Sequence, residues 1–310
     1  MRKDKKRNFR RIKQVLISSF TAASILGVLV FVTYGRAVPV LDTKGLIANQ
    51  ERDLILLTFG LGLLIVIPVL IMLFSVAWRY RASNKKAKYQ PDFAGHRGIE
   101  ALWWGIPCVV ILILGIITGV STHALDPFKP ISSAVQPVKI QVISLNWRWL
   151  FIYPDLGIAT MNYVTIPKDT PIDFSITSDA PMNSFWVPAL AGQVYAMSGM
   201  STQMHVMADS VGIFTGSSAN ISGDGFADMH FKVNSLTESD FKLWVKKTAA
   251  STATNLLTDQ SYMKLAVDSH DKAEIAYMLM EHSLYNEIIM KYMSPGESKL
   301  RRINGSGANI

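Results

Sequence analysis

The chain has 310 residues, which is enough for one large domain or two of ordinary size. Its formal net charge is +8 at pH 7, but two short runs that adjoin apolar segments, 1–13 and 79–98, hold 14 of its 31 basic residues, and acidic residues outnumber basic ones in the rest of the chain. A nucleic-acid-binding domain would carry its basic residues as a patch or stripe on a folded surface, so this distribution argues against that class and favours a membrane protein.

Two apolar segments, 54–78 and 99–122, have the length and composition of membrane-spanning helices. Each contains about the 20 residues that cross the hydrocarbon core, and 54–78 carries no charged residue. Basic residues beside membrane spans mark the cytoplasmic side. We therefore expect a cytoplasmic loop at 79–98, a short external segment at 38–53, and an external position for the chain from 123 onward.

The N-terminal segment 1–37 is expected to be a signal peptide or a further membrane segment. A basic stretch precedes the apolar residues 15–32, and small residues end the segment, which permits cleavage after Ala37. The single cysteine, Cys108, lies within the span 99–122. The external region therefore has no cysteine for a disulfide or for a blue-copper site, which needs a thiolate.

Short alternating runs in the external region predict a β-sandwich. Apolar and polar residues alternate in 138–144, 172–177 and 227–233, and turn-forming Gly, Pro, Asn and Asp residues separate these runs. The region is long enough for one such domain. We assign 123–247 to it.

The C-terminal part is expected to be helical. Small residues at 248–254 predict a linker, and from Asp271 onward side chains recur at three- and four-residue steps, which is the period of a helix. The residues at these steps are Ile275, Met278, Leu279, His282, Tyr285, Ile289 and Tyr292. We therefore predict a helical C-terminal extension over 248–293 and a flexible tail over 294–310.

Three motifs in the external region carry a family resemblance: 147–149 (Trp-Arg-Trp), 183–188 (Asn-Ser-Phe-Trp-Val-Pro) and the loop 216–229. Their order and spacing after two membrane spans resemble subunit II of the haem–copper oxidases, over about residues 38–235. The resemblance implies a cupredoxin-like Greek-key β-sandwich behind a helical hairpin. The expected fold class is therefore an α+β membrane protein.

Members of that family with a dinuclear copper centre hold it mainly in the loop that matches 216–229. At the ligand positions of this sequence only Met229 is a ligand residue, and the others are Asn183, Ser218, Asn220, Ser222 and Phe226. Copper held by sulfur and imidazole needs thiolates and free ring nitrogens, which hydroxyl, amide and phenyl groups do not supply. We therefore expect neither a metal nor a cofactor in this chain.

The joint loss of these ligands, together with the C-terminal extension, resembles the quinol-oxidase branch, of the cytochrome bo type. A quinol delivers its electrons within the bilayer, so an external copper relay is unnecessary. The resemblance implies that subunit I binds the haems, copper and ubiquinol, and that this chain is subunit II of a proton-translocating oxidase of the aerobic respiratory chain. Relatives often carry a lipoprotein cysteine at the end of the leader, and this sequence has none there.

The resemblance also implies partners and a location. The partners would be subunit I, further small membrane subunits and the lipid bilayer, but neither cytochrome c nor nucleic acid. The location would be a bacterial inner membrane, with the C-terminal domain in the periplasm. A membrane-anchored cupredoxin-like scaffold or assembly protein without turnover remains the alternative, whereas a cytochrome c oxidase subunit would need the absent copper ligands.

Glu100 is the candidate for a chemical role. It begins a Glu-x-x-x-Trp-x-x-Pro stretch at the cytoplasmic end of the second span, and in the resembling family this carboxylate lies near the mouth of a proton path into subunit I. The alternative is a carboxylate stabilised by a helix N-terminus. We expect Trp147 and Trp149 to serve packing and a subunit contact. His205 and His230 alternate with inward-facing residues, so no residual metal site is expected there.

Overall fold

The computed structural model describes residues 38–85, 95–294 and 300 of the chain. The predicted signal peptide or membrane segment at 1–37, the centre of the basic loop at 86–94 and most of the predicted tail lie outside the described residues. The chain divides into two units, and every element described below belongs to the second, Thr43–Ile310.

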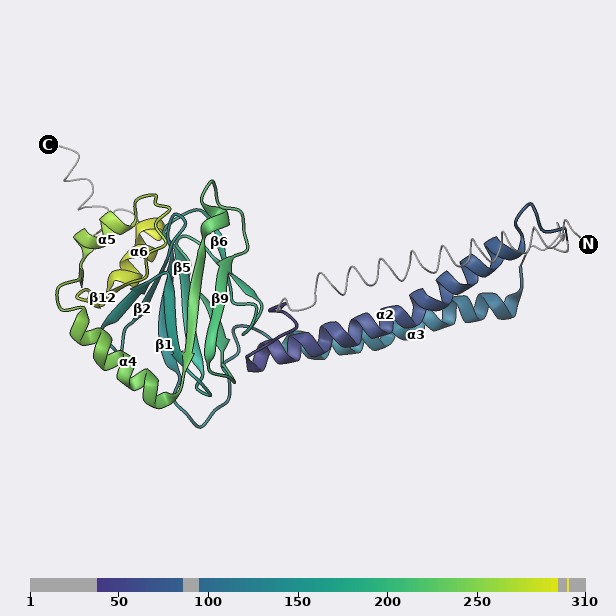
Figure 1. The fold of residues 1–310 in the computed structure, drawn as a ribbon, viewed down its shortest axis with the longest axis horizontal. Helices are drawn as coiled ribbons and strands as arrows, with labels where there is room; N and C mark the ends of the chain where they lie inside the picture. The colour runs from purple at the N-terminus through teal and green to yellow at the C-terminus, as the bar shows by residue number, and fades with distance from the viewer. Residues whose placement is uncertain (1–37, 86–94, 295–299, 301–310) are drawn as a thin grey trace, which may run out of the picture. The chain divides into compact units, whose positions relative to one another are not determined.

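Two long apolar helices come first in chain order (Figure 1). They are α2 (Leu46–Arg79) and α3 (Arg97–Ala124), and both are long and apolar enough to cross a membrane, with mean hydropathies of 2.9 and 2.3. The most apolar stretch of α2 is not buried by the rest of the chain, so lipid or the helices of a partner would have to cover it. α2 begins before the apolar segment 54–78, because the polar residues ahead of that segment continue the same helix.

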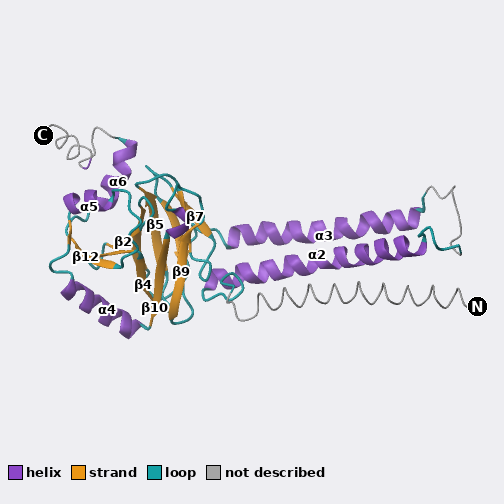
Figure 2. Ribbon diagram, turned by 45° about the horizontal axis from the view of Figure 1, so that its top comes forward, coloured by secondary structure: helices purple, strands orange, loops and turns teal. Residues whose placement is uncertain are grey.

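Two β-sheets form the domain that follows α3, as the alternating runs predicted (Figure 2). The strands are β1 (Val138–Ser144), β2 (Trp149–Tyr153), β3 (Ile158–Met161), β4 (Tyr163–Pro167), β5 (Ile172–Ser178), β6 (Asn183–Trp186), β7 (Gln193–Ala196), β8 (Thr202–Val206), β9 (Gly212–Ser218), β10 (His230–Leu236), β11 (Leu256–Leu257) and β12 (Ile275–Leu279). The seven-stranded sheet has the order β11-β12-β3-β2-β1-β5-β8, and the five-stranded sheet has the order β4-β10-β9-β6-β7. Parallel pairs, β1 with β5 and β4 with β10, lie among antiparallel ones, and this confirms the predicted cupredoxin-like sandwich.

The core between the two sheets is aromatic. Phe185 of β6 and Phe231 of β10 stack with ring centroids 5.1 Å apart. Trp149 of β2 meets these two rings at 5.4 and 5.6 Å, and all three side chains are buried. Burying each such side chain stabilises the fold by about 1.5–3 kcal/mol. In β5 the predicted alternation is confirmed over 172–176, since Ile172, Phe174 and Ile176 are buried while Asp173 and Ser175 are only half-buried, but it is wrong at Thr177, which is fully buried.

The outer face of the seven-stranded sheet is covered as well. The helices after the sandwich are α4 (Glu238–Ser251), α5 (Asp259–Leu265) and α6 (Leu284–Met293). Leu150 and Ile152 of β2 form a second apolar cluster with residues of the C-terminal part, among them Tyr262 of α5 and Ile288 of α6. Because both of its faces are covered, β2 is a continuous buried run rather than an alternating one.

The C-terminal part corrects two sequence predictions. The predicted linker 248–254 is wrong in its first half, because α4 continues to Ser251, where Ala residues favour the helix and Thr248 is buried. The predicted helix is wrong at Ile275–Leu279, which form strand β12 and pair antiparallel with β3. Backbone hydrogen bonds to the open edge of β3 outweigh the helical spacing of the side chains. Only α6 keeps the helix that this spacing predicted.

Candidate functional site

The loop that joins β9 to β10 lies beside the first residue of β6. Strands β6 and β9 are neighbours in the five-stranded sheet (Figure 1), and Phe185 lies opposite Ser218 in their register. At the base of the loop, the Ser218 N–H donates to the Met229 carbonyl at 3.1 Å. The fold therefore brings together Asn183, Ser218 and Met229, three of the positions that the sequence singled out.

Hydrogen bonds connect the polar side chains at this end of the sandwich. The Ser218 hydroxyl donates to Asn183 Oδ1 at 2.9 Å. The Asn183 Nδ2 group donates to Ser144 Oγ at 2.8 Å and to the Pro181 carbonyl at 3.0 Å. Asn183 and Ser144 are fully buried, and Ser218 is nearly so. The amide of Asn183 is thereby satisfied at both of its ends and links β6 to β1 of the other sheet.

The remaining predicted positions lie around this network. The Asn220 side chain donates to the Met182 carbonyl at 2.9 Å, which fixes the loop to the residue before β6. Phe226 is half-buried at the start of a 3-10 turn, and Met229 is buried in the core. The Ser222 hydroxyl has no hydrogen-bond partner among the described residues.

The donor set at the loop does not suit a copper pair. Amide and hydroxyl groups that are already bonded to one another replace the thiolates and imidazoles that copper prefers. Within the described ranges 38–85 and 95–294, no group of three or more His, Cys, Asp and Glu side chains is placed to hold a metal ion.

Trp147 covers the loop from the other side. Its indole N–H donates to the Ser222 carbonyl at 3.3 Å, and its ring packs so closely on Gly225 that a Cβ there would overlap it. Trp147 has a left-handed backbone conformation, with φ of 64°, which is uncommon for a bulky residue. The ring of His270 stacks on the indole with centroids 4.7 Å apart. Trp149, by contrast, is a core residue, as its predicted packing role requires.

Residues 265–274, which we call the strap, run from the end of α5 to β12 over this region. The Arg148 guanidinium donates to the carbonyls of Leu265 and Val267, the latter at 3.2 Å. At the far end of the strap, the Asn162 side-chain amide donates to the carbonyls of Asp271 and Ala273 at 3.2 Å. The strap is thus held by buried side chains of the sandwich.

An ion pair fastens the strap to the loop itself. Lys272 lies 2.8 Å from Asp228 Oδ1, and the hydrogen bond and charge of Lys272 lower the pKa of Asp228. Neither this contact nor the stacking of His270 on Trp147 was predicted from the sequence. No motif marks them, because the strap meets the loop only after the C-terminal part has folded back across the sheet.

Glu100 lies in the first turn of α3 with its side chain exposed. The helix is capped by His96, whose ring accepts the Ile99 N–H at 3.4 Å, so Glu100 is not the capping residue. A carboxylate in the first turn still gains from the helix dipole, by about 0.3–1 kcal/mol. Its position is compatible with either of the two roles that the sequence left open.

His205 and His230 have different surroundings. His230 is exposed on β10, whereas His205 is buried and its Nδ1 lies 2.7 Å from Asp173 Oδ1. Met204 and Met229 point into the core. As the alternation along these strands predicted, the side chains of the two histidines therefore lie away from the core that the two methionines enter.

Comparisons with known proteins agree with the geometry. Residues 155–236 match the family described as cytochrome c oxidase subunit II, periplasmic domain. The chain is 46% identical over 258 residues to cytochrome bo(3) ubiquinol oxidase subunit 2 of Pseudomonas aeruginosa, which covers 83% of this chain and 77% of that protein. It is 42% identical over 260 residues to ubiquinol oxidase subunit 2 of Acetobacter aceti, covering 83% of this chain and 84% of that protein.

A solved structure resembles part of the chain. It is the crystal structure of the periplasmic domain of subunit II of cytochrome oxidase from Bradyrhizobium japonicum. The similarity covers 37% of this chain and 96% of that domain, with 20% sequence identity and a TM-score of 0.36.

Proposed function

Because this chain belongs to the family of quinol oxidase subunit 2 and is subunit II of a terminal quinol oxidase, we propose that it supports the reaction without holding a redox centre itself. The observation that carries this proposal is the closed set of hydrogen bonds among Asn183, Ser218 and Ser144. Polar groups that satisfy one another inside the protein offer poor ligands to a soft metal ion.

In this proposal the redox chemistry takes place in subunit I, which binds the haems, copper and ubiquinol and translocates protons. Quinol dissolves in the bilayer, so its electrons need no relay outside the membrane. This chain contributes α2 and α3, whose exposed apolar faces would pack against subunit I, further small subunits and lipid. The sandwich would then cap subunit I outside the membrane.

The strap supports the view that no soluble cytochrome c docks on this subunit. The family's aromatic residues for accepting electrons match Trp147 and Trp149. Here Trp149 is buried, and the stacked ring of His270 covers one face of Trp147. A donor protein could not reach the buried indole of Trp149 directly, and it would meet His270 on one face of Trp147.

The membrane placement is part of the same proposal. Arg79 ends α2, Arg81 and Lys85 follow it, and Arg97 begins α3, so these basic residues gather at one end of the helical pair. That end would lie in the cytoplasm of a bacterium and the sandwich in the periplasm. The limits 54–78, 79–98 and 99–122 for the two spans and the loop between them are part of this proposal, as is an external position for the chain from 123 onward.

Purification through a tag on this subunit tests the proposal. We expect it to bring down a haem-containing complex with quinol oxidase activity, and we expect the subunit separated from that complex to bind no copper. Stoichiometric copper in the separated subunit, with the absorption of a mixed-valence pair, would overturn the proposal. A haem-free chain that purifies alone would instead support the scaffold or assembly alternative.

A further inference from the structure

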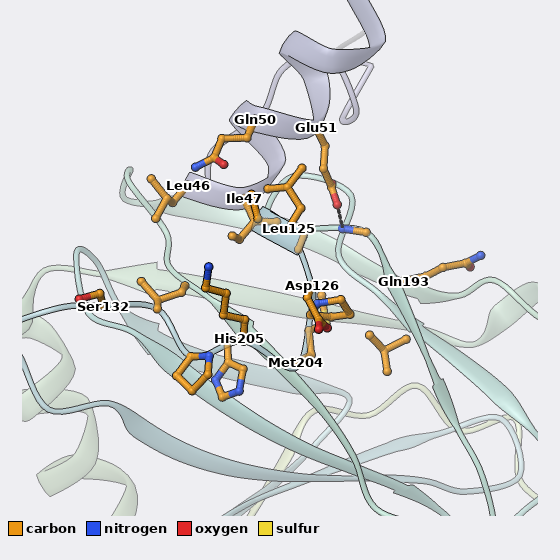
Figure 3. Close-up of a pocket in the computed structure, with 18 residues that line it drawn as sticks. Leu46, Ile47, Gln50, Glu51, Leu125, Asp126, Ser132, Gln193, Met204 and His205 are labelled. Carbon is orange, nitrogen blue, oxygen red and sulfur yellow. Dashed lines mark hydrogen bonds between the residues drawn. The ribbon is translucent and has the colours of Figure 1, made fainter. Parts of the chain in front are cut away.

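A cavity of about 420 Å³ lies where the two apolar helices join the β-sandwich. Its walls come from the first turns of α2, from the segment 124–132 that follows α3, from residues 191–194 and from β8. Figure 3 shows Glu51 and His205 on different sides of this space. Neither the loop at 216–229 nor the strap contributes to it.

His205 supplies a buried acceptor that lacks a partner. The side chain is 93% buried, and its Nδ1 lies 2.7 Å from Asp173 Oδ1, so in the neutral ring the carboxylate favours the tautomer with its proton on Nδ1. That tautomer leaves a lone pair on Nε2, which has no hydrogen-bond partner in the described part of the chain. A buried polar atom without a partner is costly, so a donor from outside the protein is expected in the cavity.

Further acceptors and one cation line the same space. Glu51 accepts the Gly192 N–H at 3.1 Å and keeps acceptor capacity on its second oxygen. Asp126 lines the cavity too, and its Oδ1 accepts the Phe128 N–H at 3.0 Å. Lys129 lines it as well, and within the residues that the structure describes its side chain makes no hydrogen bond or ion pair, while its backbone N–H donates to the Asp126 carbonyl. The cavity is thus lined by several acceptors that could bind a cation and by one side chain, Lys129, that could bind an anion.

The position of the cavity indicates where its ligand comes from. It lies at the start of α2 and the end of α3, the two helices that are apolar enough to cross a membrane, where polar residues replace apolar ones. An apolar groove begins on the following turns of α2, lined by Leu54, Ile55, Phe59, Leu63 and Val66. A ligand with a charged head and a hydrocarbon tail would fit the cavity and the groove together.

We propose that the cavity binds the headgroup of a phospholipid that carries a primary ammonium, of the phosphoethanolamine type. The ammonium donates to acceptors that line the cavity, drawn from the carboxylates of Glu51 and Asp126 and the Nε2 of His205. The phosphate accepts from Lys129, and an acyl chain follows the groove on α2. This inference goes beyond the proposed function and does not depend on where quinol is oxidised.

Lipid retention by the whole oxidase complex tests the proposal. The complex is purified in mild detergent, and bound phosphatidylethanolamine is counted per complex by native mass spectrometry. Two variants each remove one charge from the cavity. Glu51→Gln removes the negative charge but can still accept from the Gly192 N–H, and Lys129→Gln removes the positive charge. The matched control is Lys139→Gln, which alters an exposed lysine on β1 outside the cavity. Haem content confirms that each complex is intact.

We expect each cavity variant to bind this lipid at least about tenfold more weakly, since each loses a charge-assisted hydrogen bond, whereas the control matches the unaltered complex. Equal retention in all four complexes would overturn the proposal. Equal binding of phosphatidylglycerol would overturn the ammonium assignment. Soluble phosphoethanolamine that binds as tightly as the lipid would overturn the membrane source of the ligand.

Discussion

Asn183 joins the two sheets at the loop end through a single side chain. Replacing it by Leu keeps the volume but removes the partner of the Ser218 hydroxyl and of Ser144 Oγ. Leaving a buried polar group unsatisfied costs about 1–3 kcal/mol. We therefore expect Asn183→Leu to lower the free energy of unfolding by about 2–4 kcal/mol, measured by denaturant unfolding of the purified subunit.

The control for this substitution is Gln203→Leu, which alters an exposed side chain on β8. Its effect should stay within about 0.5 kcal/mol. If Asn183→Leu is no more destabilising than this control, the hydrogen bonds at the loop do not have the structural role that we assign to them.

The proposed role of Glu100 also depends on a single residue, because it requires one ionisable group. In the intact oxidase, Glu100→Gln should slow proton uptake and turnover severalfold, because the amide cannot exchange a proton. The measurement is proton uptake by the complex in liposomes, with Glu238→Gln on exposed helix α4 as the control. Uptake equal to that of the control would leave only the helix-dipole role, which affects stability by about 0.3–1 kcal/mol.

At the scale of elements, the strap and the loop hold each other through Trp147. A Cβ added at Gly225 would overlap the indole, whereas one added at Gly212 would only make ordinary contact with Phe214. Gly225 has φ of −87°, which any residue adopts, so the effect of Gly225→Ala is steric and not conformational. We expect this variant to lift the indole and to lose about 1–3 kcal/mol of stability.

Hydrogen exchange in residues 219–229 and 265–274 checks this expectation. Both segments should exchange faster in Gly225→Ala, and neither should change in Gly212→Ala. Faster exchange in the loop alone would show that the strap is held independently of Trp147.

The elements also show how far the sequence determines the fold. The spans and the sandwich strands follow from apolar length and from period-two alternation, which are local properties of the chain. The strand Ile275–Leu279 was missed because its helical spacing competes with the edge of β3, a partner more than 100 residues earlier. A single sequence does not reveal which edges remain open until the strand order is known.

The candidate site was likewise predictable from the sequence only in part. The positions of Asn183 and Ser218 were predicted, because a motif of fixed spacing marks them. The covering of Trp147 by His270 was not, since it depends on how the C-terminal part crosses the sheet. The unpartnered Nε2 of His205 was also beyond the sequence, because alternation gives the side of a strand but not what covers that side.

At the scale of the whole domain that follows α3, Asp179 ties the C-terminal helices to the sandwich. Its fully buried carboxylate accepts from the Tyr262 hydroxyl at 2.6 Å, from Lys291 at 2.6 Å and from the Tyr292 hydroxyl at 2.7 Å. Removing one member of a buried charged pair costs about 3–5 kcal/mol. We expect Asp179→Ala to expose α5 and α6 to limited proteolysis, while Asp155→Ala in an exposed turn leaves them protected.

The same cluster predicts a dependence on pH. Burial and the neighbouring Asp179 carboxylate raise the pKa of Tyr262 well above its usual 10.0. A raised folded-state pKa means that the stabilisation is complete below about pH 10 and is lost as the pH climbs through the higher value. Protease resistance of α5 should therefore persist to about pH 10 and fall above it. Loss of resistance near neutral pH would contradict this account.

The bonded amide and hydroxyl groups at the loop have a consequence for how the protein is made. If this chain holds no metal and its domain lies outside the membrane, as proposed above, the domain completes its maturation on export, without waiting for a metallochaperone or for a reductant that keeps ligand thiols ready. Growth under copper starvation should then leave the protease resistance of this subunit unchanged, even where its oxidase loses activity. Biogenesis of the complex would need copper delivery at one subunit only.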